Sequence, residues 1–271
     1  MDHFHYDNGA LHCENVPVDR IVDELGSPAY IYSRATFEHH LDAIQQAFDS
    51  LDPLICYSIK SCGNIHLLRL LREKGAGMDV VSGGELYRAQ QAGVDPQDIV
   101  YAGVGKTERE IEEALQAGIG WFNIESEHEF ETIAAIARRL NTTGRAALRI
   151  NPDVDPKTHA KTTTGKKESK FGVDIDRARR FFETYGNDPH LKLEAIHLHI
   201  GSPVYQTEPY TDAVRKAMAL IEELQGRGHT IRALDLGGGF GADYESDQSP
   251  RYDAYADAIV PIVQPFKDAG G

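Results

Sequence analysis

Three groups of residues in this sequence could do chemistry if the fold brought them together. Lys60 ends the apolar stretch ICYSIK, His197 and His199 alternate with apolar residues in LEAIHLHIG, and three glycines follow LDL at positions 237–239. Most lysines at strand ends only carry their charge out to solvent on an apolar stem. A functional role for Lys60 therefore requires other polar groups at the same ends of neighbouring strands, facing a shared pocket.

The glycine run has the composition of an anion-binding loop. Consecutive glycines let the backbone approach a ligand closely and direct amide N–H groups at an anion, typically a phosphate. An ordinary tight turn also fits, as does a dinucleotide pattern G-x-G-x-x-A through Gly237, Gly239 and Ala242, although the polar segment ADYESDQSP follows it in place of a helix. His197 and His199 could form an HxH metal pair, but no further cluster of ligands accompanies them, and we predict no metal site.

The elements that position these groups repeat seven times along the chain. From Leu54 onward, short apolar stretches alternate with longer helical patterns; the apolar stretches are ICYSIK, MDVVS, IVYAGV, WFNIES, RAALRINP, LEAIHLHIG and IRALDLGGG. This alternation predicts parallel strands joined by crossover helices, and hence an α/β protein. We predict a TIM-type (β/α)8 barrel over residues 36–271, with seven of its eight strands present and incomplete at its C-terminus. A doubly wound open sheet, which needs no further strand, is the alternative.

Strand alternation sorts side chains between the two faces of such a sheet, because neighbouring residues point to opposite sides. The bulky apolar residues belong on the helix side, which leaves a polar set for the interior: Lys60, Asp79, Asn123, Glu125, Arg149, Asn151, His197 and His199. The side of Asp79 stays open, since its stretch is apolar on both faces. Polar groups are costly in a core unless they are paired or bind a ligand. Their convergence predicts a site at the C-terminal ends of the strands.

The composition favours a small-molecule ligand. The formal net charge is −14 and the pI about 5.3, whereas nucleic acids and anionic membranes are bound by basic surfaces. Cys13, Cys56 and Cys62 form no CxxC pair, which argues against a disulfide framework or a structural zinc site. No stretch is apolar for long enough to form a membrane helix, and the start does not resemble a secretory signal. We expect a cytoplasmic protein that binds neither nucleic acid nor membrane.

The whole set of motifs resembles that of the fold-type III pyridoxal-phosphate decarboxylases. The matching stretches follow the family order: ICYSIK, MDVVSGGELYRA, FNIESEHE, LRINPDVDPKTH, HLHIGS and LDLGGGFG. The resemblance covers nearly the whole chain, and it implies decarboxylation of an amino acid by a homodimer with pyridoxal 5'-phosphate as the cofactor. The stretches DVVSGGELYRA and NPDVDPKTH favour the branch that converts meso-2,6-diaminopimelate to L-lysine over the branches that act on ornithine or arginine.

The resemblance also implies roles for particular residues. Lys60 and His199 are the catalytic pair: Lys60 is a buried amine that carries the cofactor covalently, and His199 stacks on the pyridine ring. The other cofactor-binding residues are Asp79, Arg149, Ser202, Gly237, Gly238 and Gly239. The polar stretch from Asn151 to Gly172 is long for a connection, and we expect it to close over bound substrate.

The sequence departs from the family pattern in two respects. Cys62 stands two residues after the lysine, where the family usually has asparagine, a departure that bears on the packing beside the cofactor. The family's Glu-Pro-Gly-Arg motif, whose glutamate pairs with the pyridine nitrogen, and its Cys-Glu-Ser-x-Asp motif do not occur. Residues 1–35, with a predicted hairpin at Asn8-Gly9, resemble the N-terminal segment of a β-domain that is otherwise missing. We therefore expect a C-terminally truncated chain that is inactive by itself.

A non-enzyme alternative is a barrel that only carries pyridoxal phosphate, as the small single-domain relatives do. Those relatives lack the β-domain and its N-terminal strands. HFHYDNGALHCE and PAYIYS resemble that segment in decarboxylases, so the length of the N-terminal part favours the enzyme.

Overall fold

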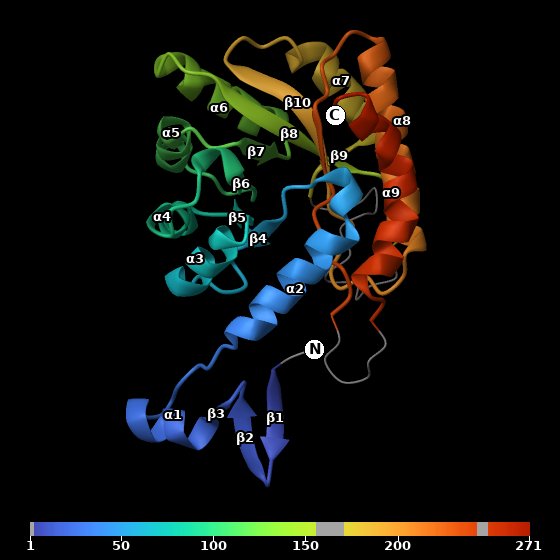
Figure 1. Cartoon of the computed structure of the whole chain (residues 1–271). Coiled ribbons are helices and arrows are strands. Elements are labelled where there is room, and N and C mark those ends of the chain that lie inside the picture. The colour runs from blue at the N-terminus through green and yellow to red at the C-terminus, as the bar shows by residue number, and fades with distance from the viewer. Residues whose placement is uncertain (1–2, 156–170, 243–248) are drawn as a thin grey trace.

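The chain forms a small N-terminal unit and a larger α/β unit, joined by a helix (Figure 1). The computed structural model describes residues 3–155, 171–242 and 249–271. The connecting helix, α2, runs from Arg34 to Ala47. It begins after Ser33, whose side chain accepts a hydrogen bond from the backbone N–H of Thr36 and so satisfies one of the free amides of the first turn.

The N-terminal unit contains the predicted hairpin. Strand β1 (Phe4–Asp7) pairs antiparallel with β2 (Ala10–Cys13), and β2 pairs with β3 (Val16–Pro17). The turn residues Asn8 and Gly9 have φ values of 48° and 84°, the left-handed region that a two-residue hairpin turn uses. Helix α1 (Val18–Leu25) follows β3, and this helix was not predicted from the sequence.

The larger unit is built on seven parallel strands in the order β11-β10-β8-β7-β6-β5-β4, with a short strand β9 paired to β8. The strands are β4 (Cys56–Ser58), β5 (Gly77–Val80), β6 (Ile99–Tyr101), β7 (Trp121–Ile124), β8 (Gly144–Asn151), β9 (Val173–Asp174), β10 (Leu191–Leu198) and β11 (Ala233–Asp235). The sheet curves into a half-barrel (Figure 1). Its strand order never reverses, so the alternative of a doubly wound sheet is wrong.

Helices connect the strands and cover the outer face of the half-barrel. They are α3 (Ile65–Glu73), α4 (Gly83–Gln91), α5 (Glu108–Ala117), α6 (Glu127–Arg139), α7 (Ile175–Tyr185), α8 (Glu208–Gly226) and α9 (Tyr252–Asp268), with 3₁₀ turns at Asp49–Leu51 and Pro96–Asp98. Several start at a side chain that accepts a backbone N–H, as at Ser82, Thr107 and Ser126. All seven predicted strand–helix units are therefore present, and α9 packs against both α8 and α2.

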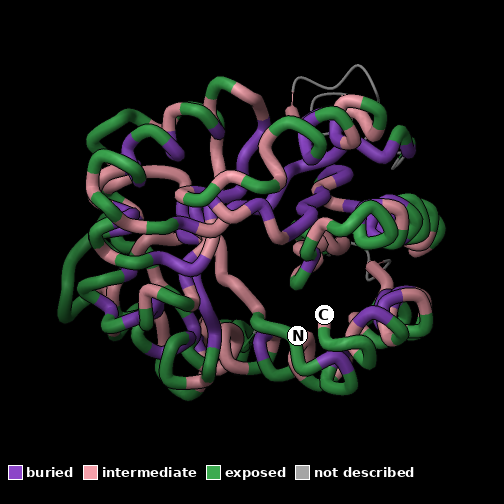
Figure 2. Tube along the Cα trace, turned by 90° about the horizontal axis from the view of Figure 1, so that it is seen from above, coloured by how far each residue is buried: buried purple, intermediate pink, exposed green. Residues whose placement is uncertain are grey.

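The core lies between the sheet and these helices. Figure 2 shows the buried residues gathered along the strands and the exposed ones on the outer turns of the helices. Apolar strand residues such as Ile124, Leu148 and Ile196 are fully buried. The buried polar residues of the strands are those that alternation assigned to the interior: Asn123, Glu125, Arg149, Asn151 and His197.

Candidate active site

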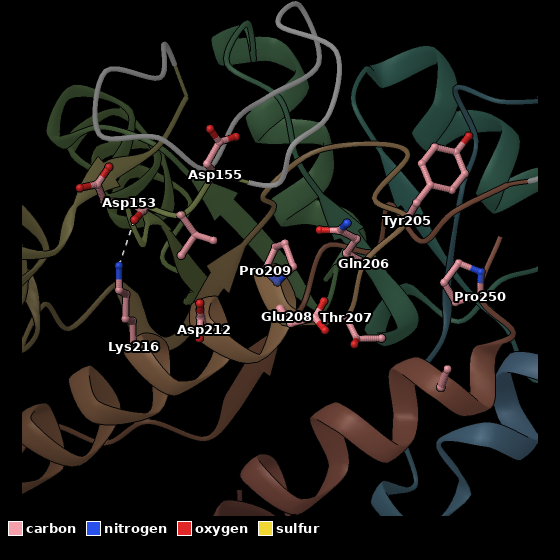
Figure 3. Close-up of a pocket in the computed structure, with 12 residues that line it drawn as sticks. Asp153, Asp155, Tyr205, Gln206, Thr207, Glu208, Pro209, Asp212, Lys216 and Pro250 are labelled. Carbon is pink, nitrogen blue, oxygen red and sulfur yellow. Dashed lines mark hydrogen bonds between the residues drawn. The ribbon is translucent and has the colours of Figure 1, made fainter. Parts of the chain in front are cut away.

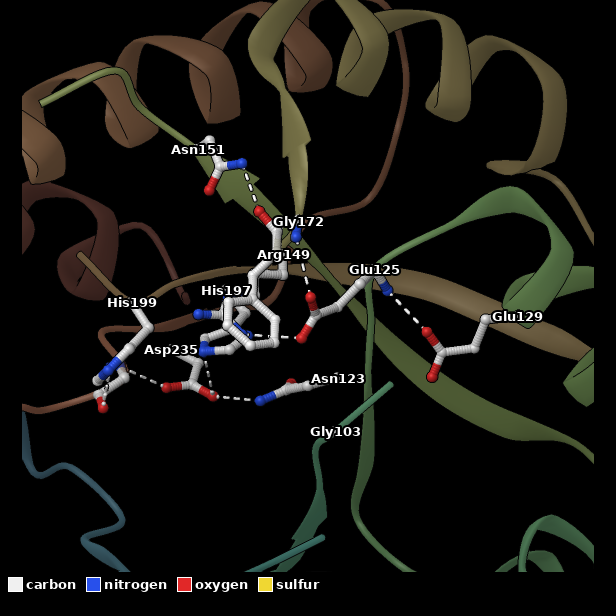
Figure 4. Close-up of polar contacts among 12 residues, drawn as sticks. Gly103, Asn123, Glu125, Glu129, Arg149, Asn151, Gly172, His197, His199 and Asp235 are labelled. Carbon is white, nitrogen blue, oxygen red and sulfur yellow. Dashed lines mark hydrogen bonds and ion pairs between the residues drawn. The ribbon is translucent and has the colours of Figure 1, made fainter. Parts of the chain in front are cut away.

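An ion pair between Arg149 and Glu125 lies at the centre of the inner face (Figure 4). Nη1 of Arg149 is 2.8 Å from Oε1 of Glu125, and both side chains are at most 10% exposed. Glu125 also accepts the backbone N–H of Gly172 at 2.9 Å, and the guanidinium of Arg149 stacks 4.9 Å from the ring centre of Phe171. Burial makes the loss of either partner costly, so the pair holds β7, β8 and the start of β9 in place.

Asp235, at the end of β11, connects three strands. Its Oδ2 accepts a hydrogen bond of 2.8 Å from Nδ2 of Asn123, and its Oδ1 accepts the N–H of Gly237 at 2.8 Å. Nε2 of His197 lies 4.0 Å from Oδ2. Burial lowers the pKa of His197, against the opposing influence of Asp235. Asp235 and His197 are register partners on neighbouring parallel strands, which is why their side chains face the same way.

His199 lies just beyond the end of β10, with its ring held by the glycine loop. Its Nδ1 is 2.8 Å from the carbonyl oxygen of Gly237. A carbonyl can only accept a hydrogen bond, so Nδ1 carries the proton. Burial, and then the positive charge of Arg149, lower the pKa of His199 to about 4. The ring is therefore neutral at pH 7, with Nε2 unprotonated.

The glycine loop has a backbone that other residues could not adopt. Gly237, Gly238 and Gly239 all have positive φ, at 68°, 67° and 85°. A Cβ atom on Gly239 would lie 2.1 Å from the carbonyl oxygen of Gly201, and one on Gly237 would lie 2.2 Å from that of Leu198. The loop therefore packs directly against the segment that carries His199, and only glycine permits this approach.

The carbonyl oxygens of this loop accept hydrogen bonds, whereas two of its amides donate none within the described residues. The oxygens of Gly238 and Gly239 accept hydrogen bonds of 2.8 Å from the Tyr210 hydroxyl and 2.9 Å from the Val204 N–H. The amides of Gly238 and Gly239 have no acceptor among the residues that the structure describes. The amide of Gly237 is already bonded to Asp235, so only two of the three predicted amides point to an unmet acceptor.

Lys60 lies in a turn, not on the strand. Strand β4 ends at Ser58, and the chain turns at once, with the N–H of Ser61 bonded to the oxygen of Ser58. Lys60 is consequently exposed, and the prediction of a buried amine is wrong. Nζ of Lys60 makes no hydrogen bond or ion pair within the described part of the chain. Its charge is still close enough to lower the pKa values of Asp79 and His199, which places it near both.

A pocket of about 580 Å³ opens beside Lys60. Its wall includes the aromatic rings of Tyr30 and Tyr32, which come from the segment before α2, and the side chains of Cys62, Glu85 and Arg88. The nearby Cys62 raises the pKa of the Tyr32 hydroxyl. Cys62, where the family usually has asparagine, therefore lies beside the N-terminal segment.

Asp79 faces the interior, which settles the side that alternation left open. Burial raises the pKa of its carboxyl to about 6, against the lowering effects of a hydrogen bond from Ser58 and of the charge of Lys60. Oγ of Ser58 lies 2.7 Å from Oδ2 of Asp79. A carboxyl group with a pKa near 6 can hold or release a proton close to neutral pH.

A second lysine on the inner face, Lys106, is held in place by its contacts, unlike Lys60. Nζ of Lys106 lies 2.6 Å from Oε1 of Glu129 and 2.6 Å from the oxygen of Gly103, and it also contacts the oxygen of Asn123 at 3.0 Å. Its side chain is 1% exposed. All three of its donors are used, so Lys106 is a structural residue.

Ser202 follows the end of β10, and the predicted lid begins at the end of β8, both at the carboxyl ends of parallel strands. Ser202 is exposed, and its hydroxyl makes no hydrogen bond with the described residues. Residues 156–170 of the predicted lid lie outside the described residues. A pocket of about 810 Å³ is lined by residues 153–155 and 205–209 among others (Figure 3), and four of its side chains are acidic: Asp153, Asp155, Glu208 and Asp212. Its floor includes Lys216, whose Nζ bonds to the backbone oxygens of Pro152 and Asp153.

Two absences concern the described residues alone. They contain no group of three or more His, Cys, Asp or Glu side chains that could hold a metal ion. None of the described helices is both long and apolar enough to cross a membrane.

The sequence analysis missed Asp235. It stands two residues before the glycine run, and alternation places it on the same face as Ala233, a signal that was present but not used. Its partner Asn123 is 112 residues away, so no local pattern could have joined them.

Comparison with known proteins decides the family. The sequence model of the family described as "Pyridoxal-dependent decarboxylase, pyridoxal binding domain" matches residues 34–270. The chain belongs to this family. The match to the family model begins at the first residue of α2, so the pyridoxal-binding domain comprises α2 and the half-barrel. Pyridoxal phosphate is the cofactor of this domain, as expected from the motifs.

Individual relatives agree. A protein of Aquifex aeolicus named diaminopimelate decarboxylase is 43% identical over 97% of this chain and 62% of its own length. One of the same name from Haemophilus influenzae is 40% identical over 99% of this chain and 65% of its own length. The crystal structure of diaminopimelate decarboxylase from Helicobacter pylori, complexed with L-lysine, superposes with a TM-score of 0.89 at 36% identity, covering 92% of this chain and 64% of that one. The chain thus spans less than two thirds of these relatives.

The residues present fit the phosphate of the cofactor. Two adjacent amides, of Gly238 and Gly239, have no acceptor among the described residues, and the backbone there has no Cβ atom that would fill the space before them. The exposed hydroxyl of Ser202 is a further donor at the same end of the sheet. This donor set suits a phosphate dianion.

Proposed function

We propose that this protein decarboxylates meso-2,6-diaminopimelate to L-lysine. The observation that carries the proposal is the meeting of an amine, a neutral imidazole and an anion-binding loop at one end of a pyridoxal-binding half-barrel: Lys60, His199 and Gly238–Gly239. The names of the relatives at 40–43% identity support the choice of substrate, as does the L-lysine in the similar crystal structure.

In this proposal, Lys60 holds the cofactor covalently and yields its place to the amino group of the substrate. The exposed position of Lys60 in a turn leaves its Nζ able to move, and the pocket beside it gives access. The contrast with Lys106, whose Nζ is bound on three sides, supports the assignment.

When bound, pyridoxal phosphate supplies an electron-withdrawing ring that takes up the electron pair left as the α-carboxylate departs as CO₂. His199 is suited to lie against such a ring, because its own ring is neutral and held at Nδ1 by Gly237. Gly238, Gly239 and Ser202 would hold the phosphate. Asp79 and the Arg149–Glu125 pair lie on the same inner face and set its charge.

The experiment is a measurement of CO₂ release by the protein extended to the length of its relatives and supplied with pyridoxal phosphate. Residues 1–271 alone are assayed beside it, and we expect them to be inactive because the motif that pairs with the pyridine nitrogen does not occur in them. From the extended protein we expect release with meso-diaminopimelate and formation of L-lysine, with at least about a hundredfold lower kcat/KM for ornithine and arginine. The variant Lys60→Ala is the control and should be inactive. Preference for ornithine or arginine would overturn the substrate; cofactor binding without release from any of the three would favour a carrier.

We also propose a cytoplasmic homodimer. The three cysteines are all free, as a reducing compartment requires, and large apolar side chains are exposed on the N-terminal unit, among them Tyr6 at 74% and Leu25 at 78%. Sedimentation analysis should give twice the chain mass, and a monomer at micromolar concentration would contradict the dimer. Cell fractionation tests the compartment.

A further inference from the structure

A continuous series of hydrogen bonds links β7 to the ring of His199 (Figure 4). Nδ2 of Asn123 donates to Asp235, whose other oxygen accepts the N–H of Gly237, and the oxygen of Gly237 accepts the proton of His199 Nδ1. Each of these three distances is 2.8 Å. The hydrogen bonds thus connect Asp235 to the His199 ring through the two backbone groups of Gly237.

The two carboxylate oxygens have separate tasks. Oδ2 binds the strand side, at Asn123, and Oδ1 binds the loop side, at Gly237. The N–H and the carbonyl of Gly237 belong to two successive peptide groups, so the two hydrogen bonds together fix the orientation of both peptide planes about its Cα. Gly237 is clamped as well by contact, since its Cα faces the oxygen of Leu198 and the Cβ of His199.

We propose that Asp235 is a positioning residue that couples the glycine loop to His199. Through this coupling, the affinity of the Gly238 and Gly239 amides for an anion and the choice of the ring nitrogen that carries the His199 proton affect each other. Through Gly237, Asp235 orients the two following amides and keeps the His199 proton on Nδ1. This inference rests on the proposed role of His199 and the glycine loop in holding the cofactor.

The direction in which anion affinity changes when Asp235 is replaced distinguishes a positioning role from a purely electrostatic one. Asp235 is negative, so its neutralisation should tighten the binding of an anion if charge were all that mattered. Positioning predicts the opposite. A leucine side chain at this position is of similar size but has no acceptor, so the N–H groups of both Asn123 and Gly237 lose their partner. The loop then loses its anchor although the charge has become more favourable.

The experiment follows the ring nitrogens of His199 by long-range ¹H–¹⁵N NMR in the cofactor-free protein, with inorganic phosphate as the probe. In the wild type we expect Nδ1 protonated, Nε2 unprotonated, and a change in both signals as phosphate binds. Asp235→Leu should give a mixture of tautomers and bind phosphate at least about tenfold more weakly, as expected for the loss of one charge-assisted hydrogen bond.

Two further variants make the result specific. The exchanged pair Asn123→Asp with Asp235→Asn restores both hydrogen bonds, because the new amide side chain on β11 can donate to the new carboxylate on β7 and still accept the N–H of Gly237. This double variant should recover the tautomer and most of the phosphate affinity. Asp42→Asn, which neutralises an exposed carboxylate paired with Lys74, should match the wild type. The exchanged pair also serves if Asp235→Leu alone does not fold.

The proposal is overturned if Asp235→Leu keeps the wild-type tautomer with phosphate affinity unchanged or increased, or if phosphate leaves the His199 signals of the wild type unmoved. Failure of the proposed reaction would look different: the wild type would release no CO₂, while the tautomer and its dependence on Asp235 could still be measured without cofactor or substrate.

Discussion

Oγ of Ser58 lies 2.7 Å from Oδ2 of Asp79 across the neighbouring strands β4 and β5. The two residues are register partners, so the contact follows directly from the pairing of the strands. The hydrogen bond stabilises the charged form of Asp79, yet burial outweighs it and raises the pKa of the carboxyl to about 6. Ser58, Asp79 and Lys60 therefore form a small unit whose charge changes just below neutral pH.

Asp79 should make the protein less stable as the pH rises. Its pKa in the folded state is raised from 3.8 to about 6, so the folded state binds the proton more tightly. The resulting stabilisation is complete below about pH 4 and is lost as the pH rises through 6. Relative to Asp79→Asn, the free energy of unfolding should fall by about 3 kcal/mol across this range, measured by urea unfolding at a series of pH values. A difference that does not vary with pH would contradict the raised pKa.

Borohydride reduction of the cofactor-loaded protein should attach the cofactor to Lys60. Its Nζ has no hydrogen bond or ion pair within the described residues, whereas that of Lys106 is bound by Glu129 and two carbonyl groups. Mass spectrometry of the peptides measures the site. The variant Lys60→Ala should lose the label and the absorbance of the bound cofactor while keeping its circular dichroism. Label on Lys106 would show that the buried ion pair opens.

Lys60 and Lys106 should also differ in how much each contributes to the free energy of unfolding. Lys106→Met removes one partner of a buried ion pair and leaves Glu129 without its cation, which should lower the free energy of unfolding by about 3–5 kcal/mol. Lys60→Met, at an exposed position, should change it by less than about 0.5 kcal/mol. Denaturant unfolding at one pH compares the two. Equal losses would mean that Lys60 has a structural role.

The glycine loop offers a matched pair of substitutions. Both Gly238 and Gly239 have positive φ, so alanine at either position should cost about 1–2 kcal/mol of backbone strain. At Gly238 the added Cβ meets nothing within 4 Å, whereas at Gly239 it lies 2.1 Å from the oxygen of Gly201 and must displace the backbone. Gly239→Ala should therefore bind pyridoxal phosphate at least about tenfold more weakly than Gly238→Ala, as measured by absorbance titration. Similar affinities would show that the loop yields without affecting the cofactor.

Much of the inner face could be predicted from the sequence. Asn123, Glu125, Arg149, Asn151 and His197 were assigned to the interior by strand alternation and are all buried there. The prediction succeeded because each of these strands is anchored by apolar residues on its other face, so a shift of one residue would expose them. The hairpin at Asn8-Gly9 succeeded for a similar local reason.

Lys60 shows where such reasoning fails. Alternation continued past Ser58 in the prediction, and it made Lys60 a buried residue; Lys60 is exposed, although its charge lies near Asp79 and His199. In the structure the chain turns after Ser58, and alternation no longer applies once the strand has ended. Helix α1 was missed for another reason: its apolar residues do repeat at helical spacing, but with eight residues it is shorter than the stretch over which this periodicity is counted.

The sequence by itself determined the order of strands and helices and the face on which most side chains of each strand lie. These are local properties, set by residues within one or two turns of one another. Only the tertiary structure decided which polar groups became partners. Asn123 meets Asp235, Arg149 meets Glu125, and the glycine loop meets His199 because β7, β8, β10 and β11 lie beside one another in a curved sheet. The hydrogen bonds that tune such a site join residues far apart in the chain, and their geometry exists only after the strands have taken their register.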